Sequence, residues 1–481
     1  MKLLVYKKKL FIVSIMILLL LLQLLTCHYI MNMSTNYPEK ALKISSWIAV
    51  GSLTIELFLW KKSSGELFSP YVFFFIVAFA FCCGQSIGWI FELDMGPKDM
   101  WNRSDHGITK YLLCEGLLYS TIGLSAFHLG ALIVNNTFHK EIIKYKAEDV
   151  VATYKQIGKL MILIVIPAFF AKMLMNIITV SSGGYGAIYT RNTSYITTLI
   201  SIISDYYQPC LLILLIAYKE NYLYRRTIIA MMLVDVIAAL YIGGRSGAVM
   251  SILGIILAYH SYIKRLTIKG LLILLGLGYV IVIILDIVAV TRGESGRTIG
   301  DIFVSASHSD SSVIGSFIGE LGWSITSVCW TMELVPSLSD YRYGTSYLVS
   351  LLSWIPTPLF GNVHPVTIYG ELSWWLQNSL RLPYGPGFSM MAEAYINFGW
   401  FGGIALFFEG TIMSKLLARV PCKRAQEDVI GSTFQIMIIM ILTKSLVRSS
   451  VDQATRSAFF VIIPLYLLIH ISLPKNGEKE K

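Results

Sequence analysis

Repeated apolar runs of about 20 residues constrain this chain more than any other feature of its sequence. A helix of that length matches the hydrocarbon core of a bilayer, and a helix satisfies its own backbone hydrogen bonds there. Only 14% of the 481 residues are charged, whereas a soluble domain carries about 25%. The sequence therefore predicts an all-α, polytopic membrane protein that forms a single integral membrane domain over residues 1–481.

The apolar runs predict twelve transmembrane helices, at residues 10–30, 44–60, 67–91, 111–134, 160–180, 196–218, 227–242, 248–263, 270–290, 388–414, 429–447 and 457–473. If the N-terminus is inside, the cytoplasmic segments hold 24 of the 39 Lys and Arg, and the outside segments hold 13. This asymmetry satisfies the positive-inside rule and predicts that both termini are cytoplasmic. The net charge of +10 thus reflects topology, and we expect no nucleic-acid partner.

A long extracytoplasmic loop, residues 291–387, is predicted between the ninth and tenth spans. The stretch 291–400 contains six of the ten Trp and six of the fourteen Pro. Its segments 313–334 and 346–359 are predicted to form short re-entrant or interfacial helices that lie half-buried over the bundle. Aromatic faces stack on sugar rings, but the same side chains also anchor interfacial helices. A long structured loop among short ones is usually functional.

Three arginines on the outer side are the candidates for binding a substrate diphosphate. Arg245 lies in G-G-R-S-G between two spans of 16 residues, about 24 Å of helix against a core of about 30 Å. That short length predicts that Arg245 sits at or below the outer headgroups, where a guanidinium needs an anion. Arg292 and Arg297 lie in T-R-G-E-S-G-R, beside small residues that allow close approach. Arginine holds phosphate oxygens through paired hydrogen bonds.

Other outside arginines are assigned more modest roles. Arg191 lies in S-S-G-G-Y-G-A-I-Y-T-R. The Gly and Tyr residues there could present backbone N–H groups and aromatic faces to a polar ligand, or they could form a flexible loop with interfacial Tyr. Arg191 is a secondary candidate. Arg342 and Arg381 are expected only to solvate the loop.

Acid or base chemistry is predicted for Glu320, Glu393 and His308. Glu320 lies in I-G-E-L-G-W, and Glu393 lies in M-M-A-E-A-Y near the outer end of a helix, where a carboxylate should face a cavity. A helix-packing hydrogen bond explains either carboxylate equally well. His364 and Glu371 are secondary candidates. The seven cysteines lack C-x-x-C spacing, so we expect no metal site, and no cofactor motif occurs.

At these residues the chain resembles the Wzy-type polymerases of O-antigen and capsular polysaccharide. The likeness lies in G-G-R-S-G-A-V-M-S-I-L, T-R-G-E-S-G-R, I-G-E-L-G-W and S-M-M-A-E-A-Y-I-N-F-G-W-F-G, within residues 241–402. The resemblance implies an inverting, metal-independent glycosyltransferase at the outer face of a bacterial cytoplasmic membrane. It implies undecaprenyl-diphosphate-linked oligosaccharides as substrates, bound by Arg245, Arg292 and Arg297. Membrane lipid and a chain-length regulator protein are the other expected partners.

Two alternatives to the polymerase remain. The related O-antigen ligases carry H-[NSQ]-x9-G-x-x-[GTY], and His308-Ser309 followed by Gly319 and Gly322 fits that pattern. A ligase would transfer glycan from the lipid carrier to a different acceptor. The second alternative is a transporter of lipid-linked oligosaccharide, suggested by ionisable residues within the predicted spans, namely Lys172, Asp205, Asp235 and Asp286.

Overall fold

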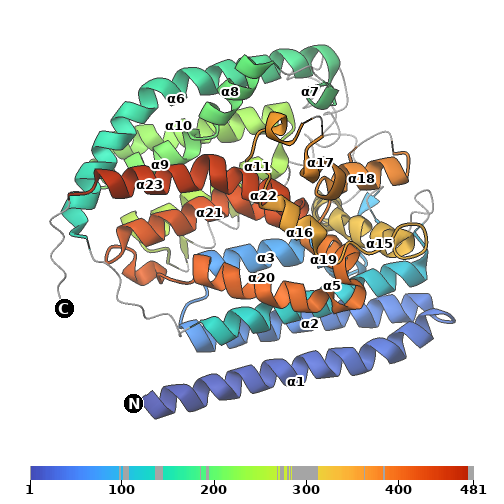
Figure 1. The fold of residues 1–481 in the computed structure, drawn as a ribbon. Helices are drawn as coiled ribbons and strands as arrows, with labels where there is room; N and C mark the ends of the chain where they lie inside the picture. The colour runs from blue at the N-terminus through green and yellow to red at the C-terminus, as the bar shows by residue number, and fades with distance from the viewer. Residues whose placement is uncertain are drawn as a thin grey trace. The chain divides into compact units, whose positions relative to one another are not determined.

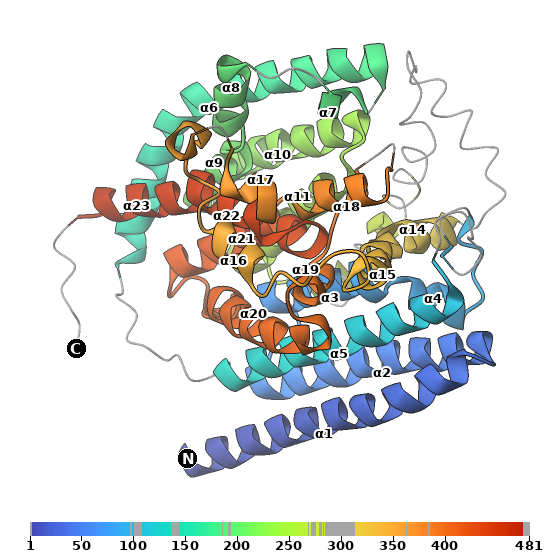
Figure 2. The same ribbon diagram turned by 45° about the vertical axis from the view of Figure 1, so that its right-hand side comes forward.

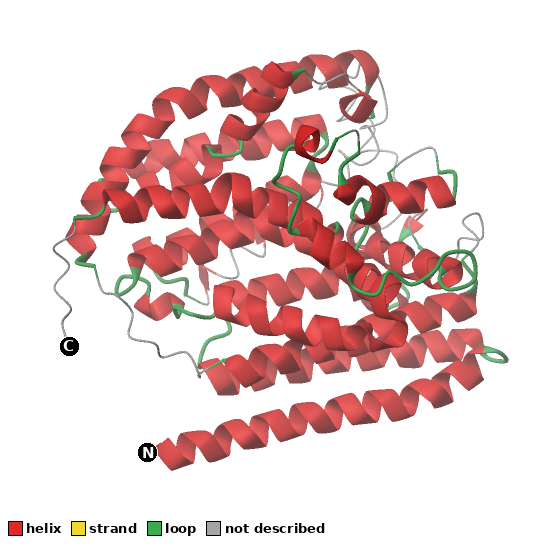
Figure 3. Ribbon diagram, viewed as in Figure 1, coloured by secondary structure: helices red, strands yellow, loops and turns green. Residues whose placement is uncertain are grey.

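The computed structural model describes residues 2–96, 99–100, 108–135, 145–184, 186–190, 194–267, 269–270, 276–278, 281, 283, 313–361, 363–382 and 385–474. Within these ranges every regular element is a helix, as Figure 3 shows. The prediction of an all-α protein is confirmed for this part of the chain. Helices occupy the positions of the predicted spans, except for 270–290, most of which lies outside the described residues.

Nine of the helices in these ranges are long and apolar enough to cross a membrane, compared with twelve predicted spans. Two of the predicted spans, 67–91 and 227–242, are not among these nine helices, for different reasons. Helix α3 (Pro70–Cys83) has only 14 residues, because the predicted span is interrupted before α4 (Gln85–Ile90). Helix α10 (Tyr222–Ile242) is longer, but it carries Arg225, Arg226 and Asp235.

The chain divides into two compact units, and the first comprises Met1–Lys140, Ile314–Arg419 and Ser445–Arg456. Helices α1 (Lys2–Ser34), α2 (Pro38–Ser64) and α5 (Lys110–Val134) lie side by side in it (Figure 1). Its other main helices are α14 (Val313–Leu321), α15 (Ile325–Leu334), α16 (Thr345–Ser350), α17 (Pro365–Tyr369), α18 (Leu372–Ser379), α19 (Met390–Phe398), α20 (Gly402–Leu417) and α22 (Val451–Ser457).

Glycines allow α5 and α20 to pack at close range. A Cβ atom on Gly410 would lie 1.8 Å from the Phe127 carbonyl oxygen, and one on Gly130 would lie 2.0 Å from the Phe407 carbonyl oxygen. The Ser414 hydroxyl also donates to the Ala131 carbonyl at 3.0 Å. Small residues and hydroxyl bonds of this kind hold helices together in lipid, where burial of apolar surface gives little driving force. This contact fixes α20, which follows α19 after the short turn Gly399–Phe401.

The segment 313–334 is helical, as predicted, but much of it is more deeply buried than expected. Helix α15 packs against α5 and α19 (Figure 2), and Trp330 is fully buried. The Ser327 and Ser389 hydroxyls are hydrogen-bonded at 2.9 Å, which joins α15 to the residue that caps α19. The predicted half-buried position is therefore wrong for α15, because its polar groups as well as its apolar ones find partners inside the first unit.

The second unit comprises Glu141–Val313, Val420–Lys444 and Ser457–Lys481. Its helices are α6 (Ala147–Gly183), α7 (Ala187–Thr190), α8 (Tyr195–Ser204), α9 (Tyr207–Ala217), α10, α11 (Arg245–Ala258), most of α21 (Val429–Arg448) and α23 (Ile463–Ser472). A π-helical turn continues α11 to Ile263.

The two helices beside G-G-R-S-G are longer than the sequence predicted. Helix α10 has 21 residues, and the span Arg245–Ile263 has 19. At 1.5 Å per residue these are about 31 Å and 28 Å, close to the thickness of the hydrocarbon core. The expectation of short helices is wrong, because helical backbone continues through charged and small residues at the ends of the apolar runs. Helix length therefore gives no reason to place Arg245 below the outer headgroups.

Candidate functional site

A buried carboxylate in the first unit joins three segments that are far apart in the sequence. Glu393 lies on α19 and is 1% exposed. One of its oxygens accepts a hydrogen bond from the Ser346 hydroxyl of α16 at 2.8 Å, and the other accepts from the Val451 backbone N–H at 2.8 Å. Val451 begins α22. Glu393 thus connects the predicted extracytoplasmic loop to two helices that follow it.

Asn397 extends this connection by one turn of α19. Its side-chain amide donates to the Ser346 hydroxyl and to the Glu393 carbonyl, both at 2.7 Å, and its oxygen accepts from the Gly344 N–H at 2.9 Å. Gly344 has a φ of 87°, in the left-handed region that glycine adopts without steric cost. The backbone of Arg342 also donates to the Ile396 carbonyl at 2.9 Å. The start of α16 is therefore held firmly on α19.

Arg342 is fixed in place, contrary to the expectation that it only solvates the loop. Its guanidinium donates to the Tyr369 and Ile368 carbonyls and lies 5.5 Å from the centre of the Trp375 ring. Burial lowers the pKa of Arg342, while the negative charge of Glu393 raises it. Because the ordinary pKa of arginine is above 12, the guanidinium stays charged. It therefore provides a positioned cation near Glu393.

Two further carboxylates contribute to the charge around Glu393 and Arg342. Glu371 occupies the position before α18, and buried Asp452 is the second residue of α22. Their charges influence each other, and the charge of Asp452 in turn acts on Glu393. Asp452 accepts hydrogen bonds from the Ser450 hydroxyl and the Gln453 side chain. The structure thus brings two predicted residues, Glu371 and Glu393, into one group of charges with Arg342 and Asp452, which we call the Glu393 cluster.

The other predicted acid–base residues lie elsewhere. Glu320 is half-buried on α14, next to Gly319, whose carbonyl accepts a hydrogen bond from the Gln85 side chain at 2.9 Å. His364 caps α17, with its Nδ1 accepting from the Val366 N–H and its Nε2 bonded to the Ile355 carbonyl, both at 3.0 Å. Both nitrogens of His364 are therefore occupied by the loop itself, which is the geometry of a structural histidine. His308 lies outside the described residues.

Of the predicted diphosphate-binding arginines, the structure describes one. Arg245 is half-buried and is the first residue of α11, two residues after Gly243, which has a φ of 102°. Arg292 and Arg297 lie outside the described residues, as does the secondary candidate Arg191. Convergence of the three predicted arginines therefore remains a prediction.

Aromatic side chains are exposed along the same loop that carries Arg342. They are Tyr343, Trp354, Tyr369 and Trp374. Tyr369 and Trp374 come from α17 and α18, the helices that also provide the carbonyl and ring contacts of Arg342. Flat apolar faces beside polar groups are what a binding surface for sugar rings requires.

A separate charged group lies among the helices of the second unit. Lys172 of α6 forms an ion pair with Asp205 at 2.7 Å, at the break between α8 and α9. The Gln208 side chain donates to Asp235 of α10 at 2.7 Å, and Ser251 of α11 is 3.4 Å from the same oxygen. The structure therefore brings together three of the four ionisable residues within predicted spans. Asp286 lies outside the described residues.

The contribution of the Lys172–Asp205 ion pair to the stability of the protein can be tested by substitution. We expect Lys172→Met to destabilise the protein by about 2–3 kcal/mol, because it leaves a carboxylate without its cation among membrane helices. The double variant K172M/D205N should recover most of that loss, since it removes both charges. Thermal unfolding in detergent measures both effects. Equal destabilisation by the single and double variants would show that the ion pair contributes nothing.

Sequence reasoning missed Ser346, Asn397 and Asp452. Asn397 could have been found, because it lies four residues after Glu393 and so on the same helix face. No sequence signal connected Ser346 to Glu393, which lies 47 residues further along the chain. The partners of a buried carboxylate are set by tertiary packing.

Nearly the whole chain matches one known protein family. The model of the family "O-antigen polysaccharide polymerase Wzy" matches residues 9–476. The matched range includes the Glu393 cluster and Arg245. No curated protein and no solved structure matches the chain significantly. Because the family match covers nearly all of a helical chain with many apolar helices, as the sequence motifs had predicted, this protein belongs to the Wzy family of O-antigen polysaccharide polymerases.

Proposed function

We propose that this polymerase joins oligosaccharide repeat units carried on undecaprenyl diphosphate at the outer face of a bacterial cytoplasmic membrane. The growing chain on its lipid carrier is the donor, and the next lipid-linked unit is the acceptor. The acceptor hydroxyl attacks the anomeric carbon of the donor, the bond from that carbon to the diphosphate breaks, and a protein base takes the hydroxyl proton. Attack from the face opposite the leaving group makes the transfer inverting, and we propose that it needs no metal.

Family membership is the observation that carries the polymerase assignment. The structure adds support for the long loop as the place of reaction. The segment from Arg342 to the end of α18 carries exposed aromatic faces and the fixed cation Arg342 itself, and hydrogen bonds at Glu393 anchor it to α19 and α22. A rigid surface that carries both sugar-stacking faces and charge suits an oligosaccharide substrate.

Two roles follow for the candidate carboxylates. Glu320 is half-buried and so remains a candidate for the base that takes the acceptor proton. Glu393 is buried and both of its oxygens already accept hydrogen bonds, which favours a positioning role over direct proton transfer. We keep His308 as a second candidate for the base and Glu371 as a candidate for a charged contact to the acceptor.

For the diphosphate we propose Arg245, Arg292 and Arg297. Arg245→Ala and Arg292→Ala should each abolish the polymer ladder while protein levels stay normal, because the leaving diphosphate loses a paired cation. Arg381→Ala is the matched control, since Arg381 is an exposed arginine of the same loop. The measurement is the length distribution of polysaccharide made by cells that carry each variant. Full ladders from both Arg245→Ala and Arg292→Ala would refute the diphosphate-binding role.

The polymerase reaction itself is tested with purified protein in vesicles and lipid-linked repeat units as the only substrate. A polymerase yields a ladder of products that differ by one repeat unit. A single transfer to a different acceptor would instead indicate a ligase. Adding a chain-length regulator protein, the expected partner, should change the most abundant length without changing the bond that is formed.

Translocation of the lipid-linked substrate is the second candidate function. The observation that favours it is the group formed by Lys172, Asp205 and Asp235, because ionisable residues among membrane helices often line a polar pathway. In the vesicle experiment, movement of the substrate across the membrane without any new glycosidic bond would support this function and contradict the polymerase.

A further inference from the structure

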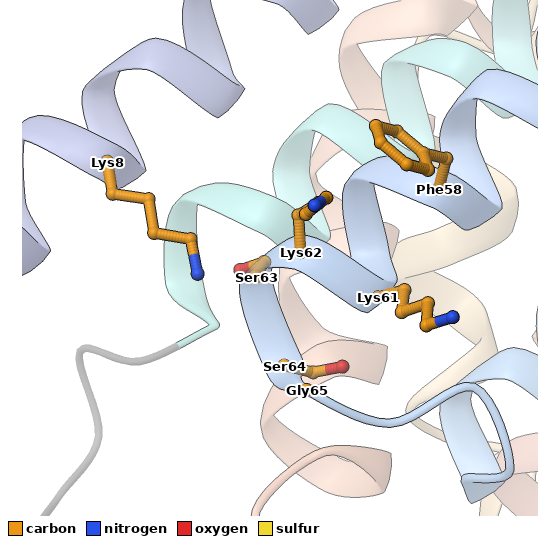
Figure 4. A pocket seen from close by; sticks show the side chains of 7 residues that line it. All are labelled: Lys8, Phe58, Lys61, Lys62, Ser63, Ser64 and Gly65. Atoms are coloured by element: carbon orange, nitrogen blue, oxygen red, sulfur yellow. The ribbon is translucent and has the colours of Figure 1, made fainter.

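A basic pocket lies where α1 and α2 have neighbouring ends, away from the Glu393 cluster. It has a volume of about 380 Å³ and is lined by Lys8, Phe58, Lys61, Lys62, Ser63, Ser64 and Gly65 (Figure 4). Lys8 comes from the N-terminal part of α1, and the other residues form the C-terminal end of α2. None of the lining residues is acidic. The volume falls within the range of about 300–1,000 Å³ that is usual for small-molecule sites.

The walls of this pocket are held by bonds to α5. The Lys9 ammonium group donates to the Ile133 carbonyl at 2.5 Å, which fixes the start of α1 against the end of α5. The Asn135 side chain, just after α5, donates to the Ser63 hydroxyl at 3.2 Å. Gly65 ends α2 in the left-handed conformation, and its backbone N–H donates to the Lys61 carbonyl at 3.0 Å. The three helix ends thus meet on one side of the first unit.

The charges in the pocket favour an anion. Lys8, Lys61 and Lys62 have exposed side chains, and each ammonium group carries a full positive charge. The end of α2 contributes a partial negative charge of about half an elementary charge, which three cations outweigh. A phosphate group, with several acceptor oxygens, would satisfy ammonium donors from both helices at once.

Apolar surface adjoins the cations on both helices, and this surface favours a phospholipid over a soluble phosphate as the ligand. Phe58 is 57% exposed, and the Lys62 ammonium lies 5.2 Å from the centre of its ring. On α1, Phe11 is 65% exposed and follows Lys8 by three residues, so the two share a helix face. A phospholipid could place its phosphate between the lysines and its acyl chains along these rings. A free phosphate ion would gain nothing from them.

The predicted topology puts this end of α1 and α2 at the cytoplasmic leaflet, where anionic lipids are concentrated and attract basic segments. We infer that the pocket binds the phosphate headgroup of an anionic phospholipid and that this lipid clamps α1 to α2. Such a lipid would hold α1 in particular, because α1 packs loosely on the rest of the protein. Only 22% of its most apolar stretch is buried inside the protein, compared with 83% of the most apolar stretch of α5.

Native mass spectrometry of the full-length protein, titrated with phosphatidylglycerol or phosphatidylcholine, tests this inference. Phosphatidylglycerol should bind more tightly. The variant K61Q/K62Q should weaken phosphatidylglycerol binding by about 30-fold, since each lysine near a membrane surface contributes about 1 kcal/mol. K61R/K62R should retain binding. The matched control is K40Q/K43Q, which removes two exposed lysines at the opposite end of α2.

Inorganic phosphate and glycerol phosphate are the soluble arms of the same experiment, and we expect neither to displace the lipid at equal concentration. Displacement by either would show that the site recognises phosphate alone and would overturn the assignment to a lipid. Equal binding of the two phospholipids would overturn it as well, and so would equal losses in K61Q/K62Q and K40Q/K43Q. Because this site is distant in sequence from the polymerase residues, these results do not depend on the proposed reaction.

Discussion

Glu393→Ala is expected to lower polymer formation by about 100-fold or more. The substitution removes the acceptor for both the Ser346 hydroxyl and the Val451 N–H, so both groups lose the bond that they donate. A donor that loses its acceptor inside a protein costs about 1–3 kcal/mol. The loop would then be held on α19 less firmly, by the Asn397 and backbone bonds alone. A displacement of about 1 Å at a reacting centre can cost about 100-fold in rate. Polymerisation by purified protein in vesicles measures the effect.

The amide variant separates a positioning role from a catalytic one. Glu393→Gln keeps the shape and one acceptor oxygen, so a positioning residue should retain part of its activity, with the pH profile of the unaltered enzyme. A general base would lose nearly all activity, and one limb of the pH profile would disappear. Glu333→Ala is the control, because it removes an exposed carboxylate from the same loop region. Normal polymer from Glu393→Ala would show that neither role exists.

Gly410→Ala is expected to have the largest effect on folding of the glycine-to-alanine changes at the described positions of the first unit. The new Cβ atom would lie 1.8 Å from the Phe127 carbonyl oxygen, so α20 and α5 would have to move apart. Overpacking of a close contact costs about 1–3 kcal/mol, and here the obstructing atom belongs to backbone, which cannot move aside easily. Thermal unfolding in detergent and the yield of folded protein both measure this loss.

The chain offers an identical substitution as a control on the same helix. At Gly403 a new Cβ atom would come no closer than 3.9 Å to Ala126, which is an ordinary contact. Gly403→Ala should therefore be neutral, or stabilising by about 0.5–1 kcal/mol, because alanine loses less backbone entropy in a helix than glycine does. Similar unfolding temperatures for the Gly403→Ala and Gly410→Ala proteins would contradict the close-packing argument.

The sequence predicted those features of the site that depend only on residues close together in the chain. It identified Glu393 as a carboxylate near the end of a helix, and that position needs only the apolar run and the charge within it. It assigned Arg342 incorrectly, because the features that fix that guanidinium are two carbonyls and a Trp ring that lie between 26 and 33 residues further along the chain. Contacts at such separations leave no periodic trace in the sequence.

Hydrophobic periodicity and length by themselves determined that this chain is a helical membrane protein and where most of its helices lie, because each membrane helix satisfies its own backbone within one segment. The motifs were also sufficient to predict the Wzy family. Only the tertiary structure decided that α10 and the span from Arg245 are long helices, that α15 is buried, and that Glu393 holds Ser346 and Val451. Those outcomes depend on which polar groups meet when separate helices pack, and a buried polar group must find its partner wherever the fold brings one.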